Sequence, residues 1–116
     1  LEPGVVRYIL AHELAHAVII QLGIPYTGSH EVAADELAAY VLTKTGRSLD
    51  LLAASRFWLS LEDEGYFVPG WDDHPTFLQR YYTLGCLGME GVGMPGPLCR
   101  PDLARVHKHW DRLLGL

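Results

Sequence analysis

Apolar residues dominate one long run near the start of the chain, from Val5 to Leu22. Placed on a helix, they cover most of its circumference, which is typical of a helix buried in a protein core. Pro3 suits the first turn of such a helix, and Gly23 suits its end. The pattern therefore predicts a buried helix over this run, with its middle near residues 12 to 16.

Apolar stripes separated by glycine and proline predict four further helices. Ser29 and Ser48 are the expected N-caps of the second and third helices, and Pro75 is the expected first residue of the fourth. No segment reads convincingly as a strand, so we expect a mainly α fold of about five helices. The four later helices are expected at about residues 30–45, 49–64, 75–90 and 101–114.

The segment His12-Glu13-Leu14-Ala15-His16 lies in the middle of the first predicted helix. Residues four apart lie about 40° apart around a helix, so both histidines can direct one ring nitrogen to the same point. Polar groups in a buried helix need partners, and Zn²⁺ is one. Glu13 projects about 100° away from His12, where it can act as general base beside the metal. The alternative is that His12 and His16 make ordinary hydrogen bonds in a helical core.

A third protein ligand is expected, because a catalytic zinc ion usually takes three. Glu31, at the start of the second predicted helix, is the candidate, and Glu36 is a second choice. Asp35 lies one turn beyond Glu31 on the same face and could accept the free ring N–H of a zinc-bound histidine. His30 is expected to stay off the metal unless its loop folds inward. The alternative is a solvated acidic face at a helix N-terminus.

With HExxH followed by ExxxD, the chain resembles the gluzincin metallopeptidases, in which these motifs bind one zinc ion. It is most similar to an uncharacterised bacterial metallopeptidase family of unknown substrate. The resemblance implies one zincin-like domain over residues 1–116, a fragment or minimal version that lacks the substrate-binding sheet that generally precedes the metal helix. The residues that carry the likeness are Glu31, Ala33-Ala34-Asp35, Trp71-Asp72-Asp73-His74, Gln79-Arg80-Tyr81-Tyr82, Cys86, Cys99 and Trp110-Asp111-Arg112-Leu113-Leu114.

Two further polar positions follow an acidic loop. His74 could donate a hydrogen bond to the oxyanion that forms during amide hydrolysis, or it could simply cap the next helix. Arg80 is expected to stabilise the loop through ion pairs with Asp72 or Asp73, rather than to bind substrate.

Cys86 and Cys99 flank a glycine-rich stretch. A disulfide between them would stabilise the fold by about 3 kcal/mol in the chain-entropy model, and two buried thiols are the alternative. We expect the bridge. Together with the family resemblance, it implies an exported protein, periplasmic or extracellular.

Charge narrows the classes of partner. The net charge is −5, and the chain has no basic cluster, which argues against nucleic acid and against anionic membrane surfaces. Arg7, His12, Glu13 and His16 interrupt the longest apolar run, so no membrane span is expected.

The sequence therefore predicts a zinc-dependent hydrolase that cleaves a peptide or protein substrate. His12, His16 and Glu31 are the expected Zn²⁺ ligands, and Glu13 is the expected base. A catalytically silent, zinc-stabilised interaction domain and a metal-free helical bundle are the alternatives.

Overall fold

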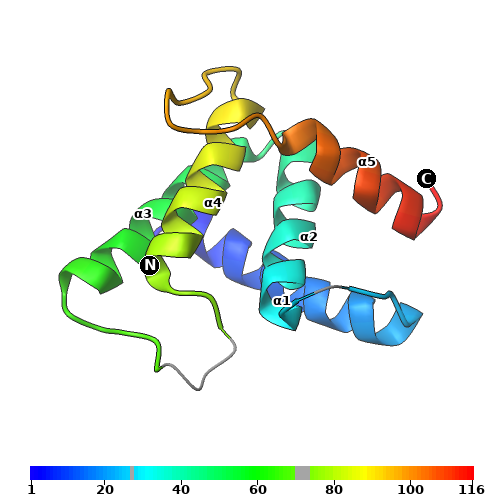
Figure 1. The fold of residues 1–116 in the computed structure, drawn as a ribbon, viewed down its shortest axis with the longest axis horizontal. Coiled ribbons are helices and arrows are strands. Elements are labelled where there is room, and N and C mark those ends of the chain that lie inside the picture. The colour runs from blue at the N-terminus through cyan, green and yellow to red at the C-terminus, as the bar shows by residue number, and fades with distance from the viewer. Residues whose placement is uncertain (27, 70–73) are drawn as a thin grey trace.

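The fold is built from helices throughout the part of the chain that the computed structural model describes, residues 1–26, 28–69 and 74–116. These residues contain no strand, so the mainly α fold expected from the sequence is confirmed. The five helices are α1 (Pro3–Leu22), α2 (His30–Lys44), α3 (Ser48–Asp63), α4 (Phe77–Gly91) and α5 (Leu103–Leu114) (Figure 1).

The reversal between α1 and α2 follows from local sequence. Gly23 ends α1 in the left-handed conformation, with φ 60°, and its N–H bonds back to the last turn of the helix. Ser29 then caps α2, because its hydroxyl oxygen accepts the backbone N–H groups of Glu31 and Val32. These two signals bring the start of α2 back against the middle of α1.

The start of α4 differs from the sequence prediction. Pro75 is not its first residue, because the helix begins at Phe77. Thr76 and Gln79 form a reciprocal capping box, in which each side chain accepts the backbone N–H of the other residue. The capping box satisfies two backbone donors at once, and this outweighs the preference of proline for a first helical position.

The starts of α3 and α5 are also displaced. Ser48 is the first residue of α3 rather than its cap, and Arg47 precedes it without a side-chain capping bond. α5 begins at Leu103 rather than at Pro101. The carboxylate of Glu90, at the end of α4, accepts backbone N–H groups at this start, including that of Leu103. A side chain distant in sequence therefore acts as the cap.

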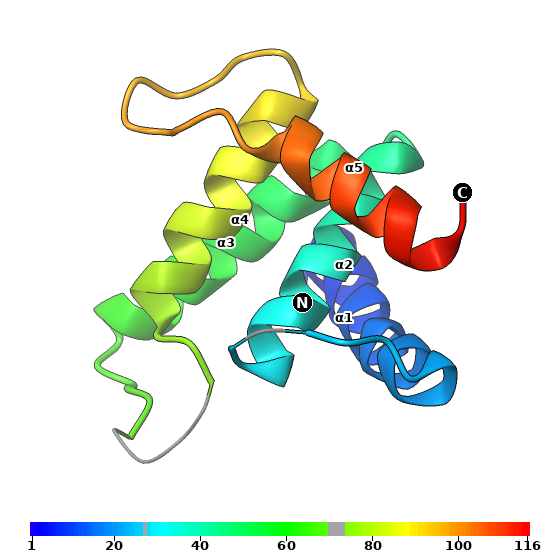
Figure 2. The ribbon, with the colours of Figure 1, turned by 45° about the vertical axis from the view of Figure 1, so that its right-hand side comes forward.

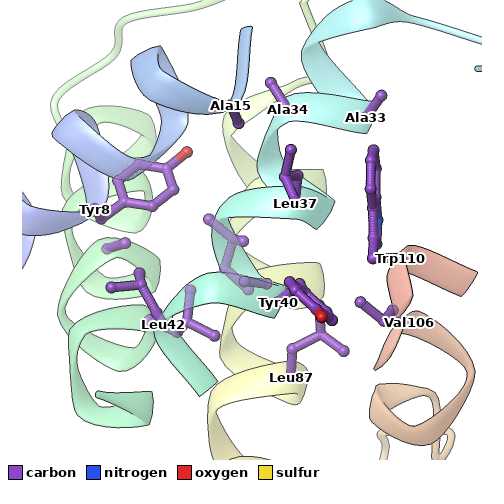
Figure 3. Packing of buried hydrophobic residues seen from close by; sticks show 14 of the residues in the cluster. Tyr8, Ala15, Ala33, Ala34, Leu37, Tyr40, Leu42, Leu87, Val106 and Trp110 are labelled. Carbon is purple, nitrogen blue, oxygen red and sulfur yellow. The ribbon is translucent and has the colours of Figure 1, made fainter. Parts of the chain in front are cut away.

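α2 lies at the centre of the molecule and contacts each of the other four helices. Its buried face is rich in alanine, and such small side chains let neighbouring helices approach closely. In Figure 3, Ala34 and Leu37 of α2 lie between Tyr8 of α1 and Trp110 of α5. Val32, near the start of α2, lies outside this face and is 43% exposed.

α3 and α4 run side by side (Figures 1 and 2). Glycines on one face of α4 allow this close approach. A Cβ atom added to Gly91 would lie 2.1 Å from the Ser48 hydroxyl oxygen, and one added to Gly85 would lie 2.7 Å from that of Ser55. The Ser55 hydroxyl also donates to the backbone carbonyl of Tyr81. This packing fixes the position of α4, whose first turn reaches the candidate site.

A disulfide joins Cys86 of α4 to Cys99, in the segment before α5. The bridge expected from the sequence is therefore present. It closes the glycine-rich stretch against α4, on which Cys86 lies.

α1 is less buried than its composition predicts. Leu10, Leu14 and Ile20 are each more than 60% exposed, because only α2 and α3 pack on this helix. Within the described residues, α1 is also the single helix long and apolar enough to cross a membrane, although charges were expected to exclude a span. The core helices of soluble proteins share these properties, and α1 contributes Val5, Tyr8, Ala15 and Ile19 to the core.

Candidate metal centre

Three predicted ligand side chains meet where α2 begins against α1. His12 and His16 lie one turn apart, and their Nε2 atoms are 3.0 Å from each other. Glu31 approaches both rings, with Oε1 3.0 Å from Nε2 of His12 and Oε2 2.8 Å from Nε2 of His16. The structure thus brings together the residues that the two sequence motifs selected.

This cluster fits a divalent metal ion such as zinc. Ligand atoms on a tetrahedral zinc ion lie roughly 3.3 Å apart, given bonds of about 2.0–2.2 Å, and the three separations here are only slightly shorter. Two imidazoles and one glutamate are also a ligand set of catalytic zinc sites. Glu13 has an oxygen within 4.8 Å of nitrogen atoms of His12 and His16. The base predicted from the sequence therefore lies beside the cluster.

Asp35 holds the far side of the His12 ring. Its Oδ1 lies 2.7 Å from Nδ1 of His12 and accepts the Tyr8 hydroxyl at 2.5 Å. With Nδ1–H donating to Asp35, the lone pair of His12 is on Nε2, which faces Glu31. The sequence predicted this contact between Asp35 and one of the two candidate ligand histidines.

A cavity of about 470 Å³ opens beside the cluster. Glu13 and His12 line it from α1, Glu31 lines it from α2, and His74 lies on its rim just before α4. Nε2 of His74 is 3.2 Å from Oε1 of Glu31. His74 is not the cap of α4, since Thr76 has that role. The acidic residues that precede it, Asp72 and Asp73, lie outside the described residues.

Comparison with known proteins assigns this arrangement to a family. The model of a family described as "Putative metallopeptidase" matches residues 3–89, which is more than half of the chain. The chain belongs to this metallopeptidase family. The match runs from α1 into α4 and includes every residue of the cluster and the cavity. Searches of curated proteins and of solved structures found no match.

Arg80 has two partners within the described part of the site. Asp72 and Asp73, its predicted partners, lie outside the described residues. Arg80 is buried, with Nε 2.9 Å from Oδ2 of Asp35 and Nη2 3.5 Å from Oε1 of Glu31. A buried guanidinium needs such paired carboxylates to offset its loss of hydration. Arg80 therefore joins α4 to the metal cluster.

His30 lies closer to the cluster than its sequence position predicted. Its ring stacks on that of His16, with centroids 4.6 Å apart and an interplanar angle of 4°. The two Nδ1 atoms are 2.6 Å apart, so His30 faces the ring nitrogen of His16 opposite Glu31. His30, His16 and Glu31 also form a group that could hold a metal. The position of His30 directly before Glu31 was the signal in the sequence that could have placed it in the site.

Glu36 was the second choice for the third ligand. Its Oε2 atom lies 3.8 Å from Nη2 of Arg105 in α5.

The close approach of these ionisable side chains shifts the pKa values of His12 and Glu31. Burial of the His12 ring opposes its charged form, but the hydrogen bond to Asp35 and its negative charge raise the pKa of His12 above its usual value. Burial also opposes the charged form of Glu31, while the neighbouring His16, His12 and His74 lower the pKa of Glu31 overall. The cluster thus keeps Glu31 negative, as a metal ligand must be.

Proposed function

We propose that this chain is a zinc-dependent peptidase of the gluzincin type, with His12, His16 and Glu31 as the zinc ligands. One observation carries the proposal: two imidazole nitrogens and one carboxylate from two helices converge within 3.0 Å of one another. Membership of a metallopeptidase family supports peptide hydrolysis as the reaction. When bound, zinc supplies a Lewis acid that polarises a peptide carbonyl and makes water more acidic.

Glu13 is the proposed general base. It lines the cavity next to His12 but belongs to the neighbouring face of α1, so it can reach a water molecule without serving as a ligand. It takes a proton from the attacking water and passes it to the leaving amine. A site that only stabilised the fold would gain nothing from a base in this position.

Two other residues complete the proposed machinery. Asp35 orients the His12 ring and fixes the tautomer that leaves Nε2 available. His74 lies at the rim of the cavity, where its ring N–H can donate to the negative charge that develops on the substrate's carbonyl oxygen. Peptides or proteins are the proposed substrates.

A catalytically silent, zinc-stabilised interaction domain is the second candidate. The exposed apolar side chains of Leu10, Leu14 and Ile20 favour it, because such side chains on one helix are suited to contact with a partner. Glu13 within the cavity is the observation against it.

The proposed location is outside the cytoplasm. The disulfide between Cys86 and Cys99 supports it, since such bridges persist in oxidising compartments.

Metal analysis joined to a peptide-library assay tests the function. The purified protein should contain zinc and cleave peptides, and a chelator should stop the cleavage. Glu13→Gln should retain zinc and lose activity by about 10²–10⁴-fold, whereas the control Glu64→Gln, at the exposed C-terminal end of α3, should behave as the wild type.

Each part of the proposal has an outcome that contradicts it. Full activity in Glu13→Gln would remove this residue from its role. Unchanged zinc content in His16→Ala would contradict the ligand set. Zinc without cleavage of any library peptide would favour the interaction domain.

A further inference from the structure

The cavity beside the candidate metal centre is lined by two unlike sets of side chains. Glu13, Glu31 and His74 are among its polar residues, where the proposed chemistry takes place. The volume of the cavity, about 470 Å³, falls within the range of cavities that enclose small ligands. Its apolar wall consists of Ile9, Trp58, Phe67, Val68, Pro69 and Phe77, and three of these six residues are aromatic.

The aromatic part of this wall is fixed by packing. Trp58 of α3 stacks on Phe77 of α4, with ring centroids 5.6 Å apart and an interplanar angle of 14°. The Arg80 guanidinium lies over the Trp58 ring, 4.4 Å from its centroid, and Tyr8 meets the same ring edge to face. Because α3 and α4 are closely packed, Trp58 and Phe77 are held in fixed positions in this wall.

Phe67 extends the wall from the segment after α3. Its side chain is 78% exposed, although it lines the cavity. Its neighbour Tyr66 is also exposed, at 60%, but does not line the cavity. An exposed phenylalanine at the mouth of an apolar cavity is positioned to be covered by a ligand, and its apolar surface would then leave water.

The charged residues that line the cavity disfavour acidic substrate side chains. The positive charge of Arg80 is already paired with Asp35 and Glu31, so it offers no free cation to an acidic group. The carboxylate of Glu13, which is not a proposed ligand, would repel an acidic side chain. An uncharged, apolar side chain therefore meets the least opposition in this cavity.

We infer that the apolar wall is the subsite for a large apolar side chain, preferably aromatic, that flanks the bond to be cleaved. The substrates are then peptides with a residue such as phenylalanine next to the scissile bond. This inference rests on the proposed function, because the wall and the proposed base share one cavity.

Matched peptides test the inference. Cleavage sites are first mapped in a peptide library by mass spectrometry, and peptides are then made that differ only in the flanking residue: Phe, Ala or Asp. The zinc-loaded protein should cleave the Phe peptide with kcat/KM at least about tenfold above that of the Ala peptide, with the Asp peptide slowest. In Phe67→Ala the preference for Phe should shrink through a higher KM, whereas Tyr66→Ala should keep it.

A binding measurement separates the subsite from catalysis. N-acetyl-phenylalanine amide is titrated into ¹⁵N-labelled, chelator-treated protein, and amide shifts are followed by NMR. Shifts at Ile9, Phe67 and Phe77 are expected, and they should weaken in Phe67→Ala but not in Tyr66→Ala. Shifts without any peptide cleavage would support the subsite and overturn the proposed function. Cleavage with no preference for Phe, or no shifts at these residues, would overturn the inference.

Discussion

Oδ1 of Asp35 lies 2.7 Å from Nδ1 of His12, on the side of the ring opposite Glu31. This contact holds the ring with Nε2 facing the other proposed ligands. Carboxylates in this position usually raise metal affinity by 10–100-fold. We therefore expect the contact between Asp35 and His12 to strengthen metal binding.

Asp35→Asn should weaken zinc binding by about 10–100-fold, because the amide keeps the shape of the side chain but loses its charge. The affinity is measured by competition with a chelator of known strength. Asp63→Asn, at the exposed end of α3, is the matched control and should bind as the wild type. Equal affinity in the two variants would show that the His12 ring does not depend on Asp35.

His30 should position His16 through its ring nitrogen. His30→Phe keeps a ring to stack on His16 but removes the nitrogen at 2.6 Å, so zinc affinity should fall by about tenfold. His30→Asn restores a polar partner and should recover most of that loss. Affinities are again measured by chelator competition. A phenylalanine variant that binds zinc as the wild type does would limit His30 to a packing role.

His74 should affect catalysis and not metal content. His74→Ala should lower kcat by about 10²-fold, because one donor to the developing oxyanion is lost, while zinc content stays the same. Kinetics and elemental analysis on the same samples check both parts. The control is His109→Ala, an exposed histidine of α5. Loss of zinc in His74→Ala would identify His74 as a ligand.

The bridge between Cys86 and Cys99 should stabilise the fold away from the metal centre. The double variant Cys86→Ser/Cys99→Ser should lose about 3 kcal/mol of unfolding free energy in the chain-entropy model. Urea denaturation of both proteins, with and without a reductant, measures this loss. If reduction of the wild type leaves its unfolding midpoint unchanged, the bridge contributes no stability.

Local signals in the sequence predicted much of the fold. Gly23 and Ser29 mark the turn between α1 and α2 correctly, because left-handed backbone and side-chain capping depend on neighbouring residues only. The start of α4 was misplaced, since proline and a capping box compete over the same few residues. The cap of α5 was not predictable, because Glu90 belongs to another helix.

In the candidate site too, contacts set by spacing within one helix could be predicted, whereas contacts between distant segments could not. Helical spacing was enough to place His12 beside His16, and Asp35 one turn from Glu31. The position of Arg80 depends on how α4 packs against α3, which spacing along the chain does not encode. The stacking of His30 on His16 likewise depends on the path of the chain between two helices.

The paired charges of Asp35 and Arg80 limit how this protein can evolve. Either residue, exchanged alone for an apolar one, would remove one partner of this buried ion pair, a change that typically costs 3–5 kcal/mol. A domain of this size has only about 5–15 kcal/mol of stability in total. Descendants with a different interior at this point should therefore have replaced both positions together.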